Sequence, residues 1–119
     1  MINGFLLVHK DSGITSSRVV QIIKKKFNLK KVGHLGTLDP MATGLLIIAV
    51  NRATKFASLL LQSEKSYRAE VTLGTQTDTD DAEGEVISSK NIHQNKSEVK
   101  EILLTFLGDS DQLPPNFSA

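Results

Sequence analysis

The chain has 119 residues, the size of one domain or part of one, and a chain of this length can bury roughly two-thirds of its unfolded surface. Its formal net charge of +1 gives no global signature of nucleic-acid binding, so any affinity for RNA must come from local patches. The absence of cysteine excludes disulfides and thiolate metal sites and fits a cytoplasmic protein. No signal peptide is expected before Gly4, and no apolar run reaches the ~18 residues of a membrane helix.

The first elements expected along the chain are a strand and a helix. Residues 4–8 predict the strand, and residues 11–13 turn the chain after it. The helix is expected to begin at a cap on Thr15 or Ser16 and to end near Phe27, because apolar residues recur there at intervals of three and four. The residues expected on its buried face are Val19, Val20, Ile22, Ile23 and Phe27.

Five lysines gather at the end of this helix and directly after it. Lys24, Lys25 and Lys26 fan around the last turn, because neighbouring residues are ~100° apart. Lys30 and Lys31 follow, just before a glycine-rich stretch. A solvated helix end, whose cations complement the helix dipole, explains any single lysine well. For the cluster we favour contact with phosphate groups, with Lys24, Lys25, Lys30 and Lys31 as the candidates.

The glycine-rich stretch at residues 33–44, GHLGTLDPMATG, is the least ordinary part of the chain. This density of glycine and proline forbids a helix and favours a shaped loop. The apolar run at residues 45–50 lacks alternation and predicts a strand buried on both faces. Asp39 therefore stands in a stiff loop at the mouth of a buried strand. The residues alone leave two possibilities about even, a functional carboxylate or a plain turn at Asp39 and Pro40.

The second half of the chain predicts short elements separated by loops. A short helix is expected over residues 56–62, with Phe56, Leu59 and Leu60 on one face. The clean alternation of residues 67–73 predicts a half-buried strand. A polar loop is expected over residues 74–84 and a partner strand over residues 85–88.

A third helix and an extended tail complete the predicted elements. The helix is expected to be capped by Asn95 or Ser97 and closed by Gly108. Its apolar face would carry Val99, Ile102, Leu103 and Phe106. The prolines of residues 112–119 exclude a helix there and predict extended chain. Together these elements predict a mixed α+β domain.

Two segments, one acidic and one rich in glycine, are candidates for ligand sites. Residues 78–85 are acidic, but a calcium loop starting at Asp78 would need glycine where Glu83 stands and glutamate where Ser89 stands. We therefore expect no metal, and expect the loop to shape one side of a cleft. The glycine-rich stretch lacks the Gly-Lys-Ser/Thr ending of a triphosphate-binding loop, so ATP is not expected either.

The sequence GHLGTLDP at residues 33–40, followed by ATGLL at 42–46, resembles the catalytic motif of the TruB family, the tRNA pseudouridine-55 synthases. Other segments match the family in its own order, at residues 5–16, 53–56, 65–68 and 74–84. The resemblance covers nearly all of this chain, although the family extends further than this chain does. It implies the pseudouridine synthase fold, an antiparallel-rich mixed sheet flanked by helices with a cleft across it.

The resemblance implies that uridine is isomerised to pseudouridine in the T-arm loop of tRNA, without a cofactor. It identifies Asp39 as the catalytic aspartate, which could attack sugar C1′, attack uracil C6 or remove a sugar proton. The target uridine must be extruded into a pocket. The resemblance implies that His34 helps to fill the space left by the flipped base and that Tyr67 packs against the uracil. Gly36 and Gly44 would let the backbone approach the nucleotide closely.

Without the resemblance, simpler roles would be preferred for two of these residues. His34 would be a histidine on a surface loop, and Tyr67 would be a core tyrosine on an apolar strand face. Both roles in RNA binding therefore depend on the family motif.

The family continues past position 119 with the rest of its catalytic domain, a basic partner for the catalytic aspartate and an RNA-binding extension. We therefore expect residues 1–119 to be the N-terminal part of a pseudouridine synthase catalytic domain. The parent protein would act as a monomer on the tRNA T-arm stem-loop, without metal or membrane. Alone, residues 1–119 are expected to expose sheet edges and apolar surface and to show no isomerisation.

Two alternatives stay open. The first is a non-catalytic RNA-binding or structural fragment. The second is a guide-RNA-directed synthase of the dyskerin type, whose members carry extra sequence ahead of the first strand. This chain begins almost on that strand, which favours the stand-alone enzyme.

Overall fold

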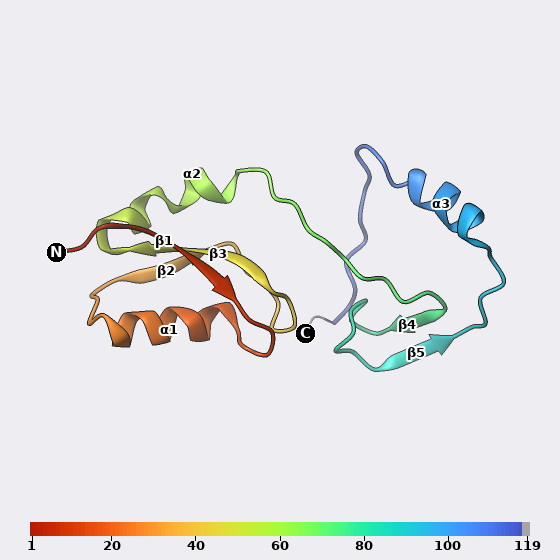
Figure 1. Ribbon diagram of the computed structural model, residues 1–119, viewed down its shortest axis with the longest axis horizontal. Helices are drawn as coiled ribbons and strands as arrows, with labels where there is room; N and C mark the ends of the chain where they lie inside the picture. Colours follow the sequence, from red (N-terminus) through yellow and green to blue (C-terminus); the bar gives the residue numbers. More distant parts are fainter. Residues whose placement is uncertain (118–119) are drawn as a thin grey trace. The chain divides into compact units, whose positions relative to one another are not determined.

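The computed structural model describes residues 1–117, so the end of the expected extended tail, Ser118 and Ala119, lies outside the described residues. The chain divides into two compact units, Met1–Tyr67 and Arg68–Ala119 (Figure 1). The elements of the first unit are β1 (Gly4–Lys10), α1 (Ser16–Lys26), β2 (Val32–Leu35), β3 (Gly44–Val50), the 3-10 helix η1 (Asn51–Phe56) and α2 (Ala57–Leu61). Those of the second unit are β4 (Thr75–Thr77), β5 (Val86–Ser89) and α3 (Lys96–Leu104).

The first unit is built on a three-stranded antiparallel sheet in the order β1-β3-β2. The central strand β3 has one face against α1, in a cluster of Leu46, Ile48 and Val50 with Val19 and Ile23. Its other face lies against the η1 and α2 side, in a cluster of Ala49 with Leu35 and Ala53. Covering both faces explains the apolar run of β3, and the expectation of a strand buried on both faces is confirmed for residues 46–50, whereas Leu45 at the start of the run is 62% exposed (Figure 1).

Helix α1 confirms the expected bounds but has a narrower buried face than expected. The Thr15 hydroxyl caps it by accepting from the Arg18 N–H at 3.1 Å, and Phe27 ends it. Val19 and Ile23, one turn apart, are buried, whereas Ile22 and Phe27 are 44% and 54% exposed. The prediction of burial for these last two residues was wrong. A three-stranded sheet covers only the stripe of the helix that faces it, and Ile22 and Phe27 lie at the margins of that stripe.

Two expectations for the first unit need smaller corrections. Residues 32–35, placed partly in the glycine-rich loop, form the edge strand β2 instead. The short helix near residue 56 is present, but Phe56 and Leu59 are exposed and only Leu60 packs against the core. Buried Asn51 directly follows β3. Its side chain accepts from the Lys31 N–H at 3.2 Å and donates to the Ile2 carbonyl, so it joins the end of β3 to the residues just before β2 and β1.

The second unit consists of a hairpin and a helix. Strands β4 and β5 pair antiparallel, with an irregularity between Gln76 and Thr77. The strand expected at residues 67–73 is absent, because no strand within residues 1–117 pairs with that segment. Alternation selects a face, but a strand also needs a hydrogen-bonded neighbour. The expected partner strand is β5, but it pairs with β4, which lies within the expected polar loop.

Helix α3 has the predicted cap and an uncovered apolar face. The Asn95 carboxamide accepts from the Glu98 N–H at 3.0 Å, and the Glu98 carboxylate accepts from the Asn95 N–H at 2.9 Å. The helix ends at Leu104 rather than near Gly108. Ile102, Leu103 and Phe106 are all exposed, so the predicted apolar face is not buried by residues 1–117. The mixed α+β fold itself is confirmed.

Candidate active site

The loop at residues 36–43 connects β2 to β3 and carries Asp39. The register of the sheet places Lys10, the last residue of β1, opposite Gly44, the first residue of β3. The end of β1 and the start of α1 therefore lie beside this loop. The loop that carries Asp39 is thus held by elements that are 20 or more residues away in the sequence, as its hydrogen bonds show.

Both neighbours of Asp39 are fixed by hydrogen bonds to the first part of the chain. On one side, the Ser16 hydroxyl donates to the Leu38 carbonyl and accepts from the Leu38 N–H, each at 3.0 Å. On the other side, the Pro40 carbonyl accepts from the Gly13 N–H at 2.8 Å and from the Lys10 ammonium at 3.1 Å. Asp39 is thus presented from a backbone anchored at the residue before it and at the residue after it.

Lys10 is the more unusual of these anchors, because its side chain is only 1% exposed. Its ammonium donates to the carbonyls of Asp11 and Ile14, both at 2.8 Å, as well as to that of Pro40. An ammonium has three protons, so all of its donors are used and the buried charge is solvated by backbone dipoles. Sequence reasoning missed both Lys10 and Ser16. The signal for Lys10 was its position two residues after Val8, because side chains two apart in a strand point to the same face and Val8 packs against the core.

The Asp39 carboxylate itself is exposed. The Asp39 backbone carbonyl accepts from the Ala42 N–H at 2.9 Å, which closes the turn. Within residues 1–117 the carboxylate forms no ion pair and no hydrogen bond to His34 or Tyr67. A fixed backbone with a free side chain is an arrangement in which a carboxylate can meet a substrate as a nucleophile or a base.

Glycine is required by the backbone at both Gly36 and Gly44. Their φ angles are +89° and +129°, a region that side chains with a Cβ rarely adopt. A Cβ at Gly36 would lie 3.5 Å from Cε of Lys65, whose ammonium binds the carbonyls of Leu61 and Ser63. A Cβ at Gly44 would meet no atom within 4 Å, so open space lies beside the backbone there.

The two predicted base-contacting residues have different environments. His34 lies in β2 rather than in a loop, is half-buried, and its Nδ1 is 3.1 Å from the Gly36 carbonyl oxygen. A proton on Nδ1 would make this a hydrogen bond and leave Nε2 as an acceptor. Tyr67 is 70% exposed at the end of the first unit and is not on a strand. The core-tyrosine interpretation of Tyr67 is therefore wrong, and its ring is open to solvent.

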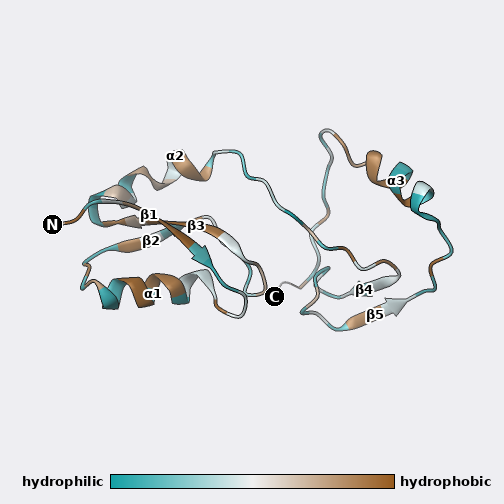
Figure 2. Ribbon diagram, viewed as in Figure 1, coloured by the Kyte–Doolittle hydropathy of each residue, from teal (hydrophilic) through white to brown (hydrophobic). Residues whose placement is uncertain are grey.

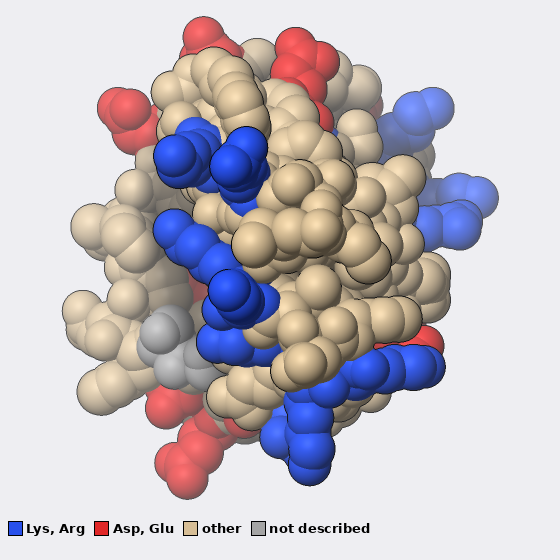
Figure 3. Space-filling model, turned by 90° about the vertical axis from the view of Figure 1, so that its left-hand side faces the viewer, with Lys and Arg blue, Asp and Glu red and all other residues tan. Residues whose placement is uncertain are grey.

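The predicted phosphate contacts are all exposed. Lys24 and Lys25 stand in the last turn of α1, and Lys30 and Lys31 follow it. Lys and Arg side chains gather on the face of the first unit that Figure 3 shows. Six basic residues and no Asp or Glu stand between Asp11 and Asp39. A chain with a net charge of +1 thus carries a strongly basic segment directly before its candidate catalytic loop.

The acidic loop after β4 is organised by its own hydrogen bonds. The Asp81 carboxylate accepts from the Thr79 hydroxyl at 2.7 Å and from the Glu83 N–H at 2.9 Å. These bonds hold the pKa of Asp81 below its usual range, and the bond from Thr79 makes the largest contribution. No three His, Cys, Asp or Glu side chains of residues 1–117 are grouped to hold a metal ion. In the same residues, no helix has both the length and the apolar character needed to cross a membrane.

Comparisons with known proteins agree on one family. The model of the "TruB family pseudouridylate synthase (N terminal domain)" matches residues 24–119. A tRNA pseudouridine synthase B of Alkaliphilus oremlandii is 46% identical over 99% of this chain and 40% of its own length. That of Blochmanniella floridana is 51% identical over 99% of this chain and 46% of its own length. The chain therefore spans less than half the length of these curated relatives.

One solved structure carries the same fold. The crystal structure of a Cbf5-Nop10-Gar1 complex contains a chain that matches 98% of this chain and 30% of its own length. The TM-score is 0.65, at 27% sequence identity.

Proposed function

We propose a function from one premise: the chain belongs to the TruB family of pseudouridylate synthases. Our proposal is that the intact protein isomerises uridine to pseudouridine in the T-arm loop of tRNA, at position 55, with Asp39 as the catalytic carboxylate. The names of the relatives support tRNA as the substrate. A tRNA substrate would in turn place the protein in the cytoplasm, where we expect it to act as a monomer.

The observation that carries the proposal is the double anchoring of the Asp39 loop. Leu38 is held by Ser16, and Pro40 is held by Lys10 and Gly13, while the carboxylate between them stays exposed. A catalytic group gains most when its position is set before the substrate binds. An ordinary surface turn has no need of a buried ammonium and a buried hydroxyl directed at its backbone.

The chemistry requires one ionised carboxylate and no external reactant. The bond between uracil N1 and sugar C1′ breaks, and a new bond joins C1′ to C5. The proton on C5 is released, and N1 takes up a proton, so the atoms and electrons balance. Asp39 could act in three ways: by adding to C1′, by adding to uracil C6, or by removing a sugar proton. All three require it beside the extruded nucleotide.

The remaining site residues would hold the RNA. The exposed ring of Tyr67 could pack against the uracil, and His34 would fill the space that the base leaves. Open space beside Gly44 and the backbone conformation of Gly36 suit close approach of a nucleotide. Lys24, Lys25, Lys30 and Lys31, which precede the glycine-rich loop in the sequence, would contact phosphates of the RNA.

Tritium release tests the reaction and its substrate together. The intact protein is incubated with a tRNA transcript whose uridines carry tritium at C5, without any guide RNA. We expect release of a single equivalent per tRNA, and none from a transcript with cytidine in place of the T-arm uridine. Release that depends on an added guide RNA would favour the dyskerin type. Binding of the tRNA without any release would favour a non-catalytic RNA-binding protein.

A further inference from the structure

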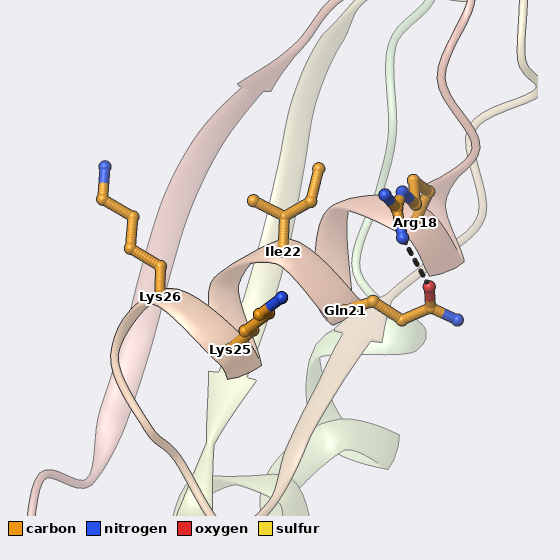
Figure 4. Close-up of a pocket in the computed structure, with 5 residues that line it drawn as sticks. All are labelled: Arg18, Gln21, Ile22, Lys25 and Lys26. Carbon is orange, nitrogen blue, oxygen red and sulfur yellow. Dashed lines mark hydrogen bonds between the residues drawn. The ribbon is translucent and has the colours of Figure 1, made fainter.

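The outer side of α1 carries a basic surface that the catalytic proposal does not use in full. A shallow depression, open to solvent, is lined there by Arg18, Gln21, Ile22, Lys25 and Lys26 (Figure 4). Of these, Lys25 is one of the four candidate phosphate contacts inferred from the sequence, and Lys26 belongs to the same cluster of five lysines; Arg18, Gln21 and Ile22 are additional. We call these five residues the α1 outer face.

The α1 outer face follows from the helical repeat. Residues 18, 21, 22 and 25 are three or four apart and so lie on one side of the helix. Ile22 and Lys26 form the edge of this face that borders the stripe of Val19 and Ile23, which packs on the sheet. The Arg18 guanidinium donates to the Gln21 carboxamide oxygen at 3.2 Å, and its other donors stay available. The Lys26 ammonium lies 5.8 Å from the centre of the Phe27 ring.

The charge of this surface is not balanced along its own segment. Helix α1 contains no acidic residue, so none of its basic side chains has an ion-pair partner within the helix. A solvated helix face usually mixes charges of both signs, because like charges on neighbouring turns repel. A basic surface without acidic neighbours on its own helix suits a polyanion.

We propose that the α1 outer face binds the phosphate backbone of the RNA stem, away from the target nucleotide. This inference rests on the proposed function for the identity of the RNA. The face supplies guanidinium, ammonium and amide donors, which bind phosphates without reading sequence. None of its five side chains is aromatic, and Phe27 at the end of the helix supplies a single exposed ring, so the face lacks the successive stacking platforms that a run of single-stranded bases needs. A double-stranded stem is therefore its ligand.

Helix α1 also fixes the distance between this surface and the catalytic loop. Its first residue, Ser16, binds the backbone of Leu38, which precedes Asp39. Lys25 comes nine residues later, which corresponds to ~14 Å along the helix axis. One rigid element therefore sets how far the stem contact lies from the carboxylate. The helix would place the target uridine by holding the stem.

The test compares two charge-matched variants of the intact protein. In the first, Arg18, Lys25 and Lys26 are each changed to Gln. In the control, the exposed lysines Lys90, Lys96 and Lys100 of the second unit are each changed to Gln. Dissociation constants are measured over a salt series with a T-arm hairpin that has its full stem and with one whose stem is shortened by half.

With the full stem, we expect the first variant to lower the slope of log affinity against log salt by roughly 0.7 to 0.9 for each lost phosphate contact. The control should keep the slope of the unmodified protein. With the shortened stem, the difference in slope between the first variant and the unmodified protein should be smaller than with the full stem. Equal slopes for all three proteins on the full stem would overturn the inference. So would an equal loss in the control, because it would make the effect one of overall charge.

Two further outcomes separate this inference from the proposed function. If the unmodified protein isomerises uridine and the α1 variant keeps its slope, the stem contact is wrong and the reaction stands. If stem binding depends on the α1 outer face but no tritium is released, the reaction is wrong and the RNA surface stands. Vesicles of anionic phospholipid are the last arm. Loss of vesicle binding in the α1 variant with an unchanged RNA slope would assign the face to a membrane surface and overturn the inference.

Discussion

The two units of the chain differ in how they use their apolar residues. In the first unit, α1 and η1 with α2 cover the two faces of the sheet, and eight hydrophobic residues are buried. In residues 68–117 no side chain is buried, although α3 carries hydrophobic residues just as α1 does (Figure 2). Helices α1 and α3 both begin at a side-chain cap, but within residues 1–117 only the first unit has a packed core.

This difference indicates that a loop is held rigidly where a packed core surrounds the residues that anchor it. Lys10 and Ser16 are buried in the first unit, and all of their buried polar atoms have hydrogen-bond partners. A buried polar group is stable only when its hydrogen bonds are made, so these two side chains are held firmly to the carbonyls and the N–H that they bind. The loop of Asp39 inherits its fixed position from that core. The acidic loop of the second unit is held by bonds among its own residues and to Thr77 at the end of the adjoining β4, where no side chain is buried. Four predictions test this contrast, from the largest expected effect to the smallest.

The largest effect is expected from Ile48→Ala in the 119-residue chain, to which the exposures of both tested residues apply. Ile48 is 0% exposed in the middle of β3, and truncation should lower the free energy of unfolding by about 2–5 kcal/mol. The matched change Ile102→Ala, on the 53% exposed face of α3, should alter it by no more than about 0.5 kcal/mol. Hydrogen exchange of the β3 and α3 amides reports each unit separately. Similar losses at the two sites would remove the contrast between the units.

A smaller effect is expected from Lys10→Met, which keeps the length of the side chain and removes its donors. The carbonyls of Asp11 and Ile14 would lose the ammonium, and the Pro40 carbonyl would keep only the Gly13 N–H, at a cost of about 1–3 kcal/mol in the free energy of unfolding. The single-turnover rate of isomerisation should fall as well, because the Asp39 loop would be held at Pro40 by the Gly13 N–H alone. Lys55→Met, at an exposed position, is the control. A variant with normal stability and rate would show that the ammonium does not position the loop.

Ser16→Ala should lower the free energy of unfolding by about 1 kcal/mol. It removes both hydrogen bonds between the Ser16 hydroxyl and the Leu38 backbone. Ser17→Ala changes the neighbouring, exposed serine and should have almost no effect. Denaturant unfolding of the two variants gives the comparison directly. Equal stabilities would mean that Ser16 contributes nothing as an anchor.

The smallest effect concerns the pKa of Asp81 in the second unit. Thr79→Val removes the hydroxyl that is the main cause of the lowered pKa, so the pKa should rise toward the ordinary value of ~3.9. Because the folded-state pKa is lowered, the carboxylate stabilises the loop above about pH 4, and this contribution is lost as the pH falls through the folded pKa. Carboxyl chemical shifts followed by NMR during a pH titration measure it. An unchanged midpoint, or an equal change in Thr72→Val, would contradict the assignment.

Much of the first unit could be predicted from the sequence. The apolar run of β3 and the spacing of α1 reflect burial, which leaves a direct pattern in the chain. The strand predicted at residues 67–73 failed because alternation does not reveal whether a partner strand is available. Ile102 and Phe106 have helical spacing for the same reason that core residues do, yet nothing in residues 1–117 covers them.

The candidate site was predictable only in part. Asp39 stands in a long motif of glycines and a proline, so the sequence pointed to its loop. The anchors Lys10 and Ser16 could not be found that way, because their bonds to Pro40 and Leu38 join residues 30 and 22 positions apart. Only the pairing of β1 with β3 brings them to the loop. A lysine at a strand end otherwise looks like a surface residue.

The most direct test of the central claim is Asp39→Asn in the intact protein, assayed by tritium release under single-turnover conditions. The change keeps the size of the side chain and the anchors at Leu38 and Pro40, and it removes the charge. We predict a loss of at least ~100-fold in rate with little change in tRNA affinity, whereas Asp11→Asn, a change at the exposed acid beside Lys10, should keep its rate. Appreciable turnover by the Asp39→Asn protein would contradict the account.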